Sequence, residues 1–146
     1  MTSSETTWDG LPVAAEPPFG ATVLVYRRSP SRLLMLHRAH HGPDYDGDWA
    51  WTPPSGSRQP GEDITACAVR ELAEEAGISN VRIVPIDLGG DRWKHYGCEL
   101  PASTGVRLVD PEHDRFEWLA VAVALARVRP DLVRTDLAIL CERLGL

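Results

Sequence analysis

The most informative stretch of this 146-residue chain runs from Gly56 to Ile78 and reads GSRQPGEDITACAVRELAEEAGI. Pro60-Gly61 predicts a turn, and Asp63 is a suitable N-cap for a helix that follows it. Gly77 suits the left-handed position at which many helices end, and Ile78 can supply the apolar contact that accompanies such an end. These residues alone therefore predict a loop, a helix and a turn.

Three carboxylates gather on one face of the expected helix. At about 100° per residue, Glu71, Glu74 and Glu75 lie within an arc of roughly 100°. The opposite face is expected to pack on a core through its apolar residues, which are Ala66, Val69, Leu72, Ala73 and Ala76. Like charges at these spacings destabilise a helix by about 0.2–0.5 kcal/mol per pair, and Arg70 offsets part of this cost through Glu74.

This carboxylate cluster predicts a metal site. Oxygen ligands are what Mg²⁺ and Mn²⁺ prefer, and Mg²⁺ takes further oxygens from substrate phosphates. The spacing therefore favours a helix-borne Mg²⁺ site, with Mn²⁺ as an alternative, that handles phosphates. A solvated acidic helix face is the other interpretation, and the carboxylates by themselves do not separate the two.

The whole stretch resembles the signature of the Nudix hydrolases, G-x5-E-x7-R-E-U-x-E-E-x-G-U, in which U is aliphatic. Every fixed position of that signature is filled, by Gly56, Glu62, Arg70, Glu71, Leu72, Glu74, Glu75, Gly77 and Ile78. The resemblance implies an α/β fold of the Nudix type, an α/β/α sandwich with a mixed β-sheet between helices.

The resemblance also implies a role for the matched residues. Glu71, Glu74 and Glu75 would hold the divalent metal and take part in catalysis, and the backbone carbonyl of Gly56 would join them as a ligand. One departure lies next to this set: Ser55 stands where many relatives have a glycine. Serine can serve there if the backbone is not strictly left-handed.

Two further matched positions would support the site. In Nudix hydrolases the residues matching Glu62 and Arg70 orient the helix and its carboxylates through ion pairing. Outside the stretch, Glu112 precedes the aromatic segment Arg115–Leu119. Many Nudix hydrolases look similar here, and in several the acid supplies a further metal ligand or the catalytic base. We therefore place Glu112 among the expected metal ligands and catalytic residues; an ordinary charged loop residue is the alternative.

Substrate contacts are expected from three short segments. His37 and Arg38 end a strand and can reach a substrate phosphate, with a surface basic pair as the alternative. Trp49 and Trp51 alternate and so share a strand face. They can stack on a base, although packing in the core or at its rim competes with that role. Trp93–Tyr96 falls on a strand that could line the cleft.

Apolar patterns and turn residues predict the remaining elements. Strands are expected at Ala21–Arg28, Leu33–His37, Trp49–Thr52, Val81–Leu88, Trp93–Leu100 and Arg115–Leu119. A helix is expected at Asp131–Leu144 with Asp131 as its cap, and Val121–Val128 is either a short helix or an extended link. Residues 1–18 are expected to form a partly flexible N-terminal extension, and residues 19–146 a single domain.

Composition narrows the class of partner and the compartment. The net charge of −6 argues against a sequence-independent nucleic-acid binder, so no nucleic-acid polymer is expected as a partner. Three widely spaced cysteines suggest neither a disulfide framework nor a zinc site, and they fit a reducing cytosol. No apolar run of signal-peptide or membrane-spanning type is present. A cytoplasmic protein without membrane association is expected, and a homodimer is one option for its assembly.

The leading hypothesis is metal-dependent hydrolysis of a phosphoanhydride bond in a nucleoside diphosphate linked to another group, as in nucleoside triphosphate pyrophosphohydrolases. One alternative is a nucleotide-sensing Nudix module without turnover. A second is an activity like that of isopentenyl-diphosphate isomerase, which would require a cysteine opposite the acidic site.

Overall fold

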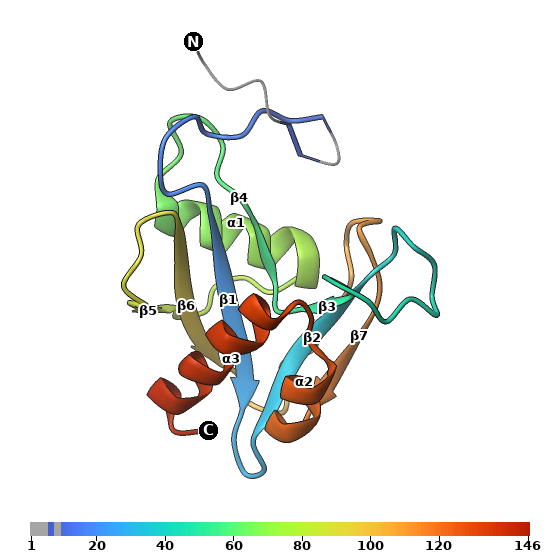
Figure 1. Cartoon of the computed structure of the whole chain (residues 1–146). Coiled ribbons are helices and arrows are strands. Elements are labelled where there is room, and N and C mark those ends of the chain that lie inside the picture. The colour runs from blue at the N-terminus through green and yellow to red at the C-terminus, as the bar shows by residue number, and fades with distance from the viewer. Residues whose placement is uncertain (1–5, 8–9) are drawn as a thin grey trace.

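The computed structural model describes residues 6–7 and 10–146, and within them a mixed sheet lies between helices (Figure 1). The strands are β1 (Gly20–Arg27), β2 (Arg32–Arg38), β3 (Trp51–Thr52), β4 (Ser55–Ser57), β5 (Val84–Ile86), β6 (Trp93–Glu99) and β7 (His113–Leu119). The helices are α1 (Ile64–Ala76), α2 (Val121–Arg127) and α3 (Asp131–Leu144).

The sheet is built around β1. Its main path has the order β3-β2-β1-β6-β5, while β4 also pairs with β1 and β7 also pairs with β2. The β1–β6 pair is parallel, from Gly20 opposite Trp93 to Tyr26 opposite Glu99, and the other pairs are antiparallel. This mixture of directions confirms the predicted mixed sheet.

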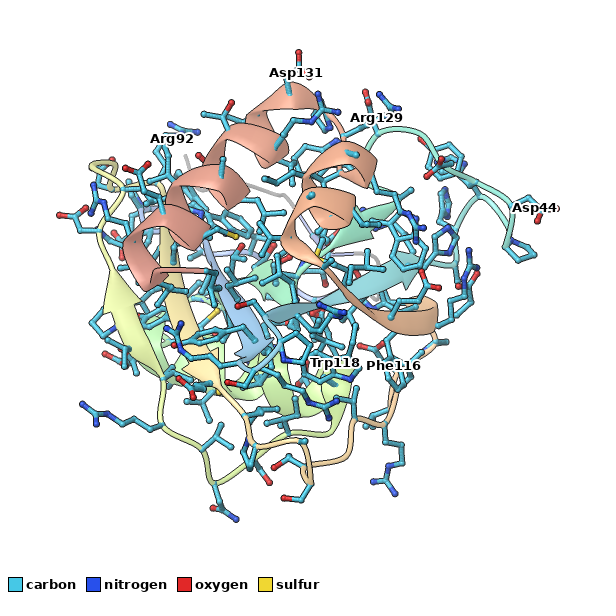
Figure 2. The ribbon with its side chains drawn as sticks, turned by 90° about the horizontal axis from the view of Figure 1, so that it is seen from below. Asp44, Arg92, Phe116, Trp118, Arg129 and Asp131 are labelled. Atoms are coloured by element: carbon cyan, nitrogen blue, oxygen red, sulfur yellow. The ribbon has the colours of Figure 1, made fainter. Side chains whose placement is uncertain are left out.

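Side chains that alternate along β1 separate two layers of core. Val23 and Val25 pack with Leu72 of α1, whereas Leu24 packs with Leu137 of α3. In Figure 1, α1 lies behind the sheet and α2 and α3 lie in front of it. Figure 2 shows the aromatic side chains of β7 on the side away from α2 and α3, and they belong to the α1 layer. The structure is therefore the predicted α/β/α sandwich.

The ends of α1 follow the prediction, but its buried face does not. Asp63 caps the helix by accepting from the Ala66 N–H at 3.0 Å, and Gly77 ends it with φ 65°. The predicted apolar face was wrong in part, because Ala66 is exposed and Val69 is 45% exposed. Compared with the prediction, the buried face of α1 is shifted toward the side that carries the carboxylates. Its buried residues are Cys67, Ala68, Glu71, Leu72, Glu75 and Ala76.

Three other predictions need correction. The strand expected at Val81–Leu88 is only β5, because Val84–Ile86 alone pair with β6, while Val81 and Ile83 pack on the α1 layer and Leu88 on the α3 layer. Trp49 lies outside β3, in a turn with φ 65°. Asp131 is the first residue of α3 and not its cap, since Pro130 occupies the cap position. The segment after β7, left open between helix and link, forms α2.

The start of the chain makes contacts with the domain. Residues 1–5 and 8–9 of the expected extension lie outside the described residues, and the division at residue 19 stays a prediction. Ala14 is buried, and its N–H donates to the Arg58 carbonyl at 2.8 Å. No helix in the described ranges has the length and apolar character needed to cross a membrane.

Candidate active site

Arg58 fixes the loop that enters α1. It is 6% exposed, and its guanidinium donates to the carbonyls of Glu16 at 2.9 Å, Pro18 at 2.7 Å and Glu62 at 2.9 Å. The loop is thereby attached to the segment before β1. Sequence reasoning missed Arg58, because it occupies a position that the signature leaves unspecified.

Arg70 is the centre of an ion-pair network on α1. Its Nε and Nη2 donate to the two oxygens of Glu62 at 2.8 and 3.0 Å. Its Nη1 donates to Glu71 at 2.9 Å and to Glu74 at 3.1 Å, and Nη2 also reaches the Ser57 carbonyl at 3.0 Å. The hydrogen bonds between Arg70 and Glu62 lower the pKa of the Glu62 carboxyl and raise the pKa of the Arg70 guanidinium. This geometry is the one expected of orienting residues.

Strand β4 lies against the buried carboxylates. A Cβ at Gly56 would overlap the Glu71 carboxylate, so any larger residue would require that carboxylate to move. The Ser55 N–H donates to Glu75 Oε2 at 2.9 Å. Ser55 does not have a positive φ, so serine fits where relatives have glycine. The Gly56 carbonyl lies 3.9 Å from Cys67 Sγ, and its ligation of a metal stays a prediction.

The three glutamates of α1 differ in their surroundings. Burial raises the pKa of Glu71 to about 7, against the lowering effect of the Arg70 charge. Glu75 is 1% exposed, and burial, followed by the charges of Glu71 and Glu112, raises its pKa well above the ordinary value. The side chain of Glu74 is 52% exposed. The structure therefore buries two of the three carboxylates that the sequence placed on one face.

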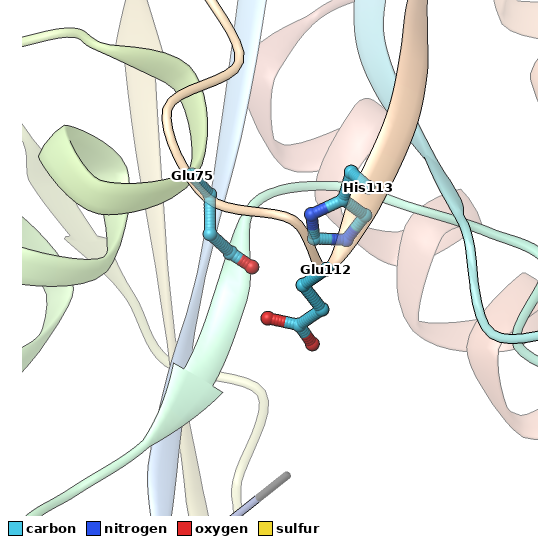
Figure 3. A group of neighbouring side chains, drawn as sticks. All are labelled: Glu75, Glu112 and His113. Carbon is cyan, nitrogen blue, oxygen red and sulfur yellow. The ribbon is translucent and has the colours of Figure 1, made fainter. Parts of the chain in front are cut away.

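A second segment meets α1 just before β7. Glu112 is tied to the end of β2, because its carbonyl accepts from the Ala39 N–H at 2.9 Å. Glu75, Glu112 and His113 each offer a ligand atom, and these atoms lie within 4.8 Å of one another (Figure 3). Burial, followed by the charge of Arg38, lowers the pKa of His113 to about 4. The tertiary fold thus brings Glu112 to the helix carboxylates.

These residues fit a divalent cation. Two buried carboxylates with raised pKa values are costly without a positive charge beside them, and carboxylate oxygens are the ligands that Mg²⁺ and Mn²⁺ take. Glu71, Glu75 and Glu112 would hold the cation, and Glu74 extends from the same helix toward solvent.

Two cavities share Trp49 as a wall. The first, here called the α3 cavity, has a volume of about 700 Å³. It is lined by Ala14, Ala15, Phe19, Thr22, Trp49, Thr52, Pro53, Ser55, Arg92, Trp93, His95, Leu132, Val133, Asp136, Leu137 and Leu140. The second, here called the loop cavity, has a volume of about 510 Å³. It is lined by Arg38, Ala39, His40, His41, Asp48, Trp49, Pro111 and Glu112.

The expected substrate contacts divide according to burial. Arg38 and Trp49 line the loop cavity, and Trp49 is 45% exposed. His37 is fully buried, with Nδ1 2.8 Å from Asp114 and Nε2 2.7 Å from the Tyr45 carbonyl. The prediction that His37 reaches a phosphate was therefore wrong for this structure, since both ring nitrogens are engaged inside the fold.

The aromatic predictions divide in the same way. Trp51 is 3% exposed and packs in the α3 layer, so its predicted stacking on a base was wrong. Trp49 and Trp51 do not share a strand face, because Trp49 precedes β3 in a turn. Trp93 and His95 line the α3 cavity as expected, whereas Tyr96 is buried in the α1 layer.

The cysteines do not supply the thiol that an isomerase would require. Cys67, Cys98 and Cys141 are all buried, and burial raises their pKa values to about 12, 11 and 11. None of the three lines either cavity.

Similar proteins agree with the fold and the signature. An octanoyltransferase from Myxococcus xanthus is 30% identical over 84% of this chain, but the chain spans only 37% of that protein. An RNA pyrophosphohydrolase from Rhodospirillum rubrum is 26% identical, over 79% of this chain and 85% of its own length. A C. elegans Ap4A hydrolase structure has a TM-score of 0.68 and 24% identity, covering 86% of this chain and 98% of that one.

The family assignment comes from the match over most of the domain. The model of the NUDIX domain matches residues 17–138, a range that includes the signature, Glu112 and most of both core layers. On this match, and with the sandwich fold and the complete signature described above, the chain belongs to the Nudix hydrolase family.

Proposed function

We propose that this protein hydrolyses a phosphoanhydride bond in a nucleoside diphosphate linked to another group, with Mg²⁺ as the metal and Mn²⁺ as an alternative. The observation that carries the proposal is that Glu112 lies close to the buried Glu75 of α1, on the helix that also carries Glu71, next to two cavities. Ser55 lines the α3 cavity and binds Glu75, and Glu112 lines the loop cavity. A diphosphate at the carboxylates can therefore extend into both cavities.

The two cavities suit the two ends of such a substrate. The α3 cavity offers Phe19, Trp49 and Trp93 as planar walls for a base. The loop cavity offers the cationic Arg38 beside His40 and His41, which suits a further phosphate or another anionic group. The similar proteins include an Ap4A hydrolase and an RNA pyrophosphohydrolase, which supports a pyrophosphate linkage beside a nucleoside as the bond that is cut.

Hydrogen bonds from Arg70 and Ser55 hold the glutamates that the reaction needs. When bound, the divalent cation would neutralise charge on the diphosphate and lower the pKa of the water that attacks phosphorus. Arg70 holds Glu71 and Glu74 in place, and Ser55 holds Glu75. One carboxylate among Glu71, Glu74, Glu75 and Glu112 must accept the proton of the attacking water. The reaction otherwise needs positioning and charge stabilisation more than covalent chemistry by the protein.

A product assay over nucleoside triphosphates, dinucleoside polyphosphates and nucleotide sugars tests the proposal. The wild-type protein is expected to cleave at least one class only when Mg²⁺ or Mn²⁺ is present. Glu75→Gln should reduce kcat at least about 100-fold, because a charged ligand is lost while shape is kept. Glu99→Gln is the matched control, since Glu99 is exposed and pairs with Arg28 on the surface.

Two outcomes oppose the proposal. Wild-type turnover by Glu75→Gln would remove Glu75 from the site. Tight nucleotide binding without any product, with or without metal, would support the sensing module instead of the hydrolase.

A further inference from the structure

His113 is a buried histidine with an unsatisfied ring nitrogen. Its side chain is 2% exposed, and its Nδ1 has no hydrogen-bond partner among the described residues. The Asp110 carboxylate lies 3.9 Å from this nitrogen, which is too far for a hydrogen bond. Buried polar nitrogens are almost always paired, so an unpaired one indicates a missing ligand, ion or water.

The environment of His113 identifies the kind of ligand that is missing. Figure 3 shows the imidazole beside the carboxylates of Glu75 and Glu112. A ring nitrogen of His113 lies within 4.8 Å of a carboxylate oxygen of each. Two ligands on opposite sides of an ion are roughly 4.2 Å apart at ordinary metal–oxygen distances. Small side-chain adjustments therefore bring all three donors to one cation.

The backbone already holds these donors in position. His113 begins β7 and pairs with Arg38 of β2, and Glu75 is fixed by the Ser55 N–H. The Arg38 guanidinium lies 3.9 Å from Glu112 and competes with a cation for that carboxylate. The negative charge of Glu112 adds to burial in raising the pKa of Glu75, so a positive ion between the two carboxylates is favoured over a neutral molecule.

We propose that Glu75, Glu112 and His113 form a mixed oxygen and nitrogen site for a first-row transition ion such as Mn²⁺, next to the carboxylates of Glu71 and Glu74. An imidazole nitrogen adds affinity for first-row transition ions, which increases in the order Mn²⁺, Fe²⁺, Co²⁺, Ni²⁺, whereas Mg²⁺ takes oxygen ligands. The site therefore favours a first-row transition ion over Mg²⁺ at one metal position, and Mn²⁺ is the member of that series used as the probe. This inference rests on the proposed metal-dependent hydrolysis.

Pulsed electron paramagnetic resonance of Mn²⁺ bound to the full chain tests the nitrogen donor directly. The expected spectrum contains modulation from a directly bound ¹⁴N nucleus. Protein labelled with ¹⁵N only at histidine is expected to show the ¹⁵N pattern instead. Neither measurement needs a variant, so a folding defect cannot obscure the result.

Variants then locate the nitrogen. His113→Phe keeps the ring volume and removes both nitrogens, so the modulation should disappear. Calorimetric titration should show a Kd for Mn²⁺ about 10- to 100-fold higher and a smaller change for Mg²⁺. The double substitution His40→Ala and His41→Ala, in the loop cavity, should keep the modulation.

Two results overturn the inference. The first is bound Mn²⁺ with no nitrogen modulation in the wild-type protein, which would leave a water between His113 and Asp110 as the occupant. The second is modulation that survives His113→Phe and disappears in the His40 and His41 variant. Mg²⁺-dependent hydrolysis alongside either result would support the proposed function while refuting the nitrogen ligand. Nitrogen modulation in a protein without hydrolytic activity would support the ligand and refute the proposed function.

Discussion

At the scale of single residues, the buried carboxylates of α1 destabilise the metal-free protein. The pKa of Glu71 rises from 4.5 to about 7 on folding, chiefly through burial. At 1.36 kcal/mol per unit, a shift of this size costs about 3 kcal/mol once the group is ionised. Because the folded pKa is raised, the favourable contribution of the neutral acid is fully present below pH 4.5 and is lost as the pH rises through 7.

Glu71→Gln should therefore become more stable relative to the wild type as the pH rises. The expected gain between about pH 5 and pH 8 is roughly 2–3 kcal/mol in the free energy of unfolding without metal. Urea denaturation of both proteins in chelator measures it. His113 acts in the opposite direction, since its pKa is lowered to about 4, but it is present in both proteins. A difference independent of pH would contradict the assignment.

Arg70 illustrates a second property of single residues, the geometry of its charged group. Arg70→Lys keeps the charge but cannot span both oxygens of Glu62. We expect kcat to fall about 10- to 100-fold with little change in melting temperature, because the carboxylates lose their orientation. Steady-state kinetics with Arg82→Lys, on an exposed loop, as the control should separate this effect from the general effect of lysine.

At the scale of elements, the contact between β4 and α1 depends on a missing side chain. Gly56→Ala places a methyl group into the Glu71 carboxylate, although the φ of Gly56 is not positive. The expected cost is about 1–3 kcal/mol, as for other overpacked sites, together with a large loss of metal-dependent turnover. Thermal unfolding and kinetics measure both quantities.

Gly90→Ala is the matched control for that substitution. Gly90 has no positive φ, and nothing lies within 4 Å of a Cβ built there. Equal effects of the two substitutions would show that the contact with Glu71 is not the cause.

Local signals predicted some elements well. The Asp63 cap and the Gly77 end fixed α1, and apolar spacing located α3, because these features depend on neighbours in sequence. Strand β4 is short and lacks an apolar pattern, so nothing in Ser55–Ser57 indicated it.

The rotation of α1 also lay beyond local reasoning. Amphipathic spacing places glutamates outside, but Arg70 and the Ser55 N–H compensate Glu71 and Glu75 inside. The partnership of His113 with Glu75 was missed for the same reason, since it exists only after β7 pairs with β2. The sequence and its resemblance to the Nudix signature thus grouped Glu112 with Glu75, but they did not predict that His113 would lie beside them.

At the scale of the whole molecule, Trp49 connects the two cavities. Trp49→Ala should raise KM for nucleotide substrates about 10-fold, since loss of stacking on a base costs about 1–3 kcal/mol. The melting temperature should change little, because the side chain is 45% exposed. Val109→Ala, at another exposed apolar residue that lines neither cavity, is the control. An unchanged KM would place the substrate elsewhere.

The attachment of Arg58 to Glu16 and Pro18 has a consequence for any shortening or fusion of the chain at its start. Removal of residues 1–18 would leave Arg58 with only the Glu62 carbonyl of its three acceptors and would delete Ala14, which lines the α3 cavity. A hydrogen bond of a charged group contributes about 1.5–3 kcal/mol. Fusion of another protein before Glu16 should therefore be tolerated. Truncation to the start of β1 should increase the mobility of the loop between Arg58 and Glu62, which leads into α1.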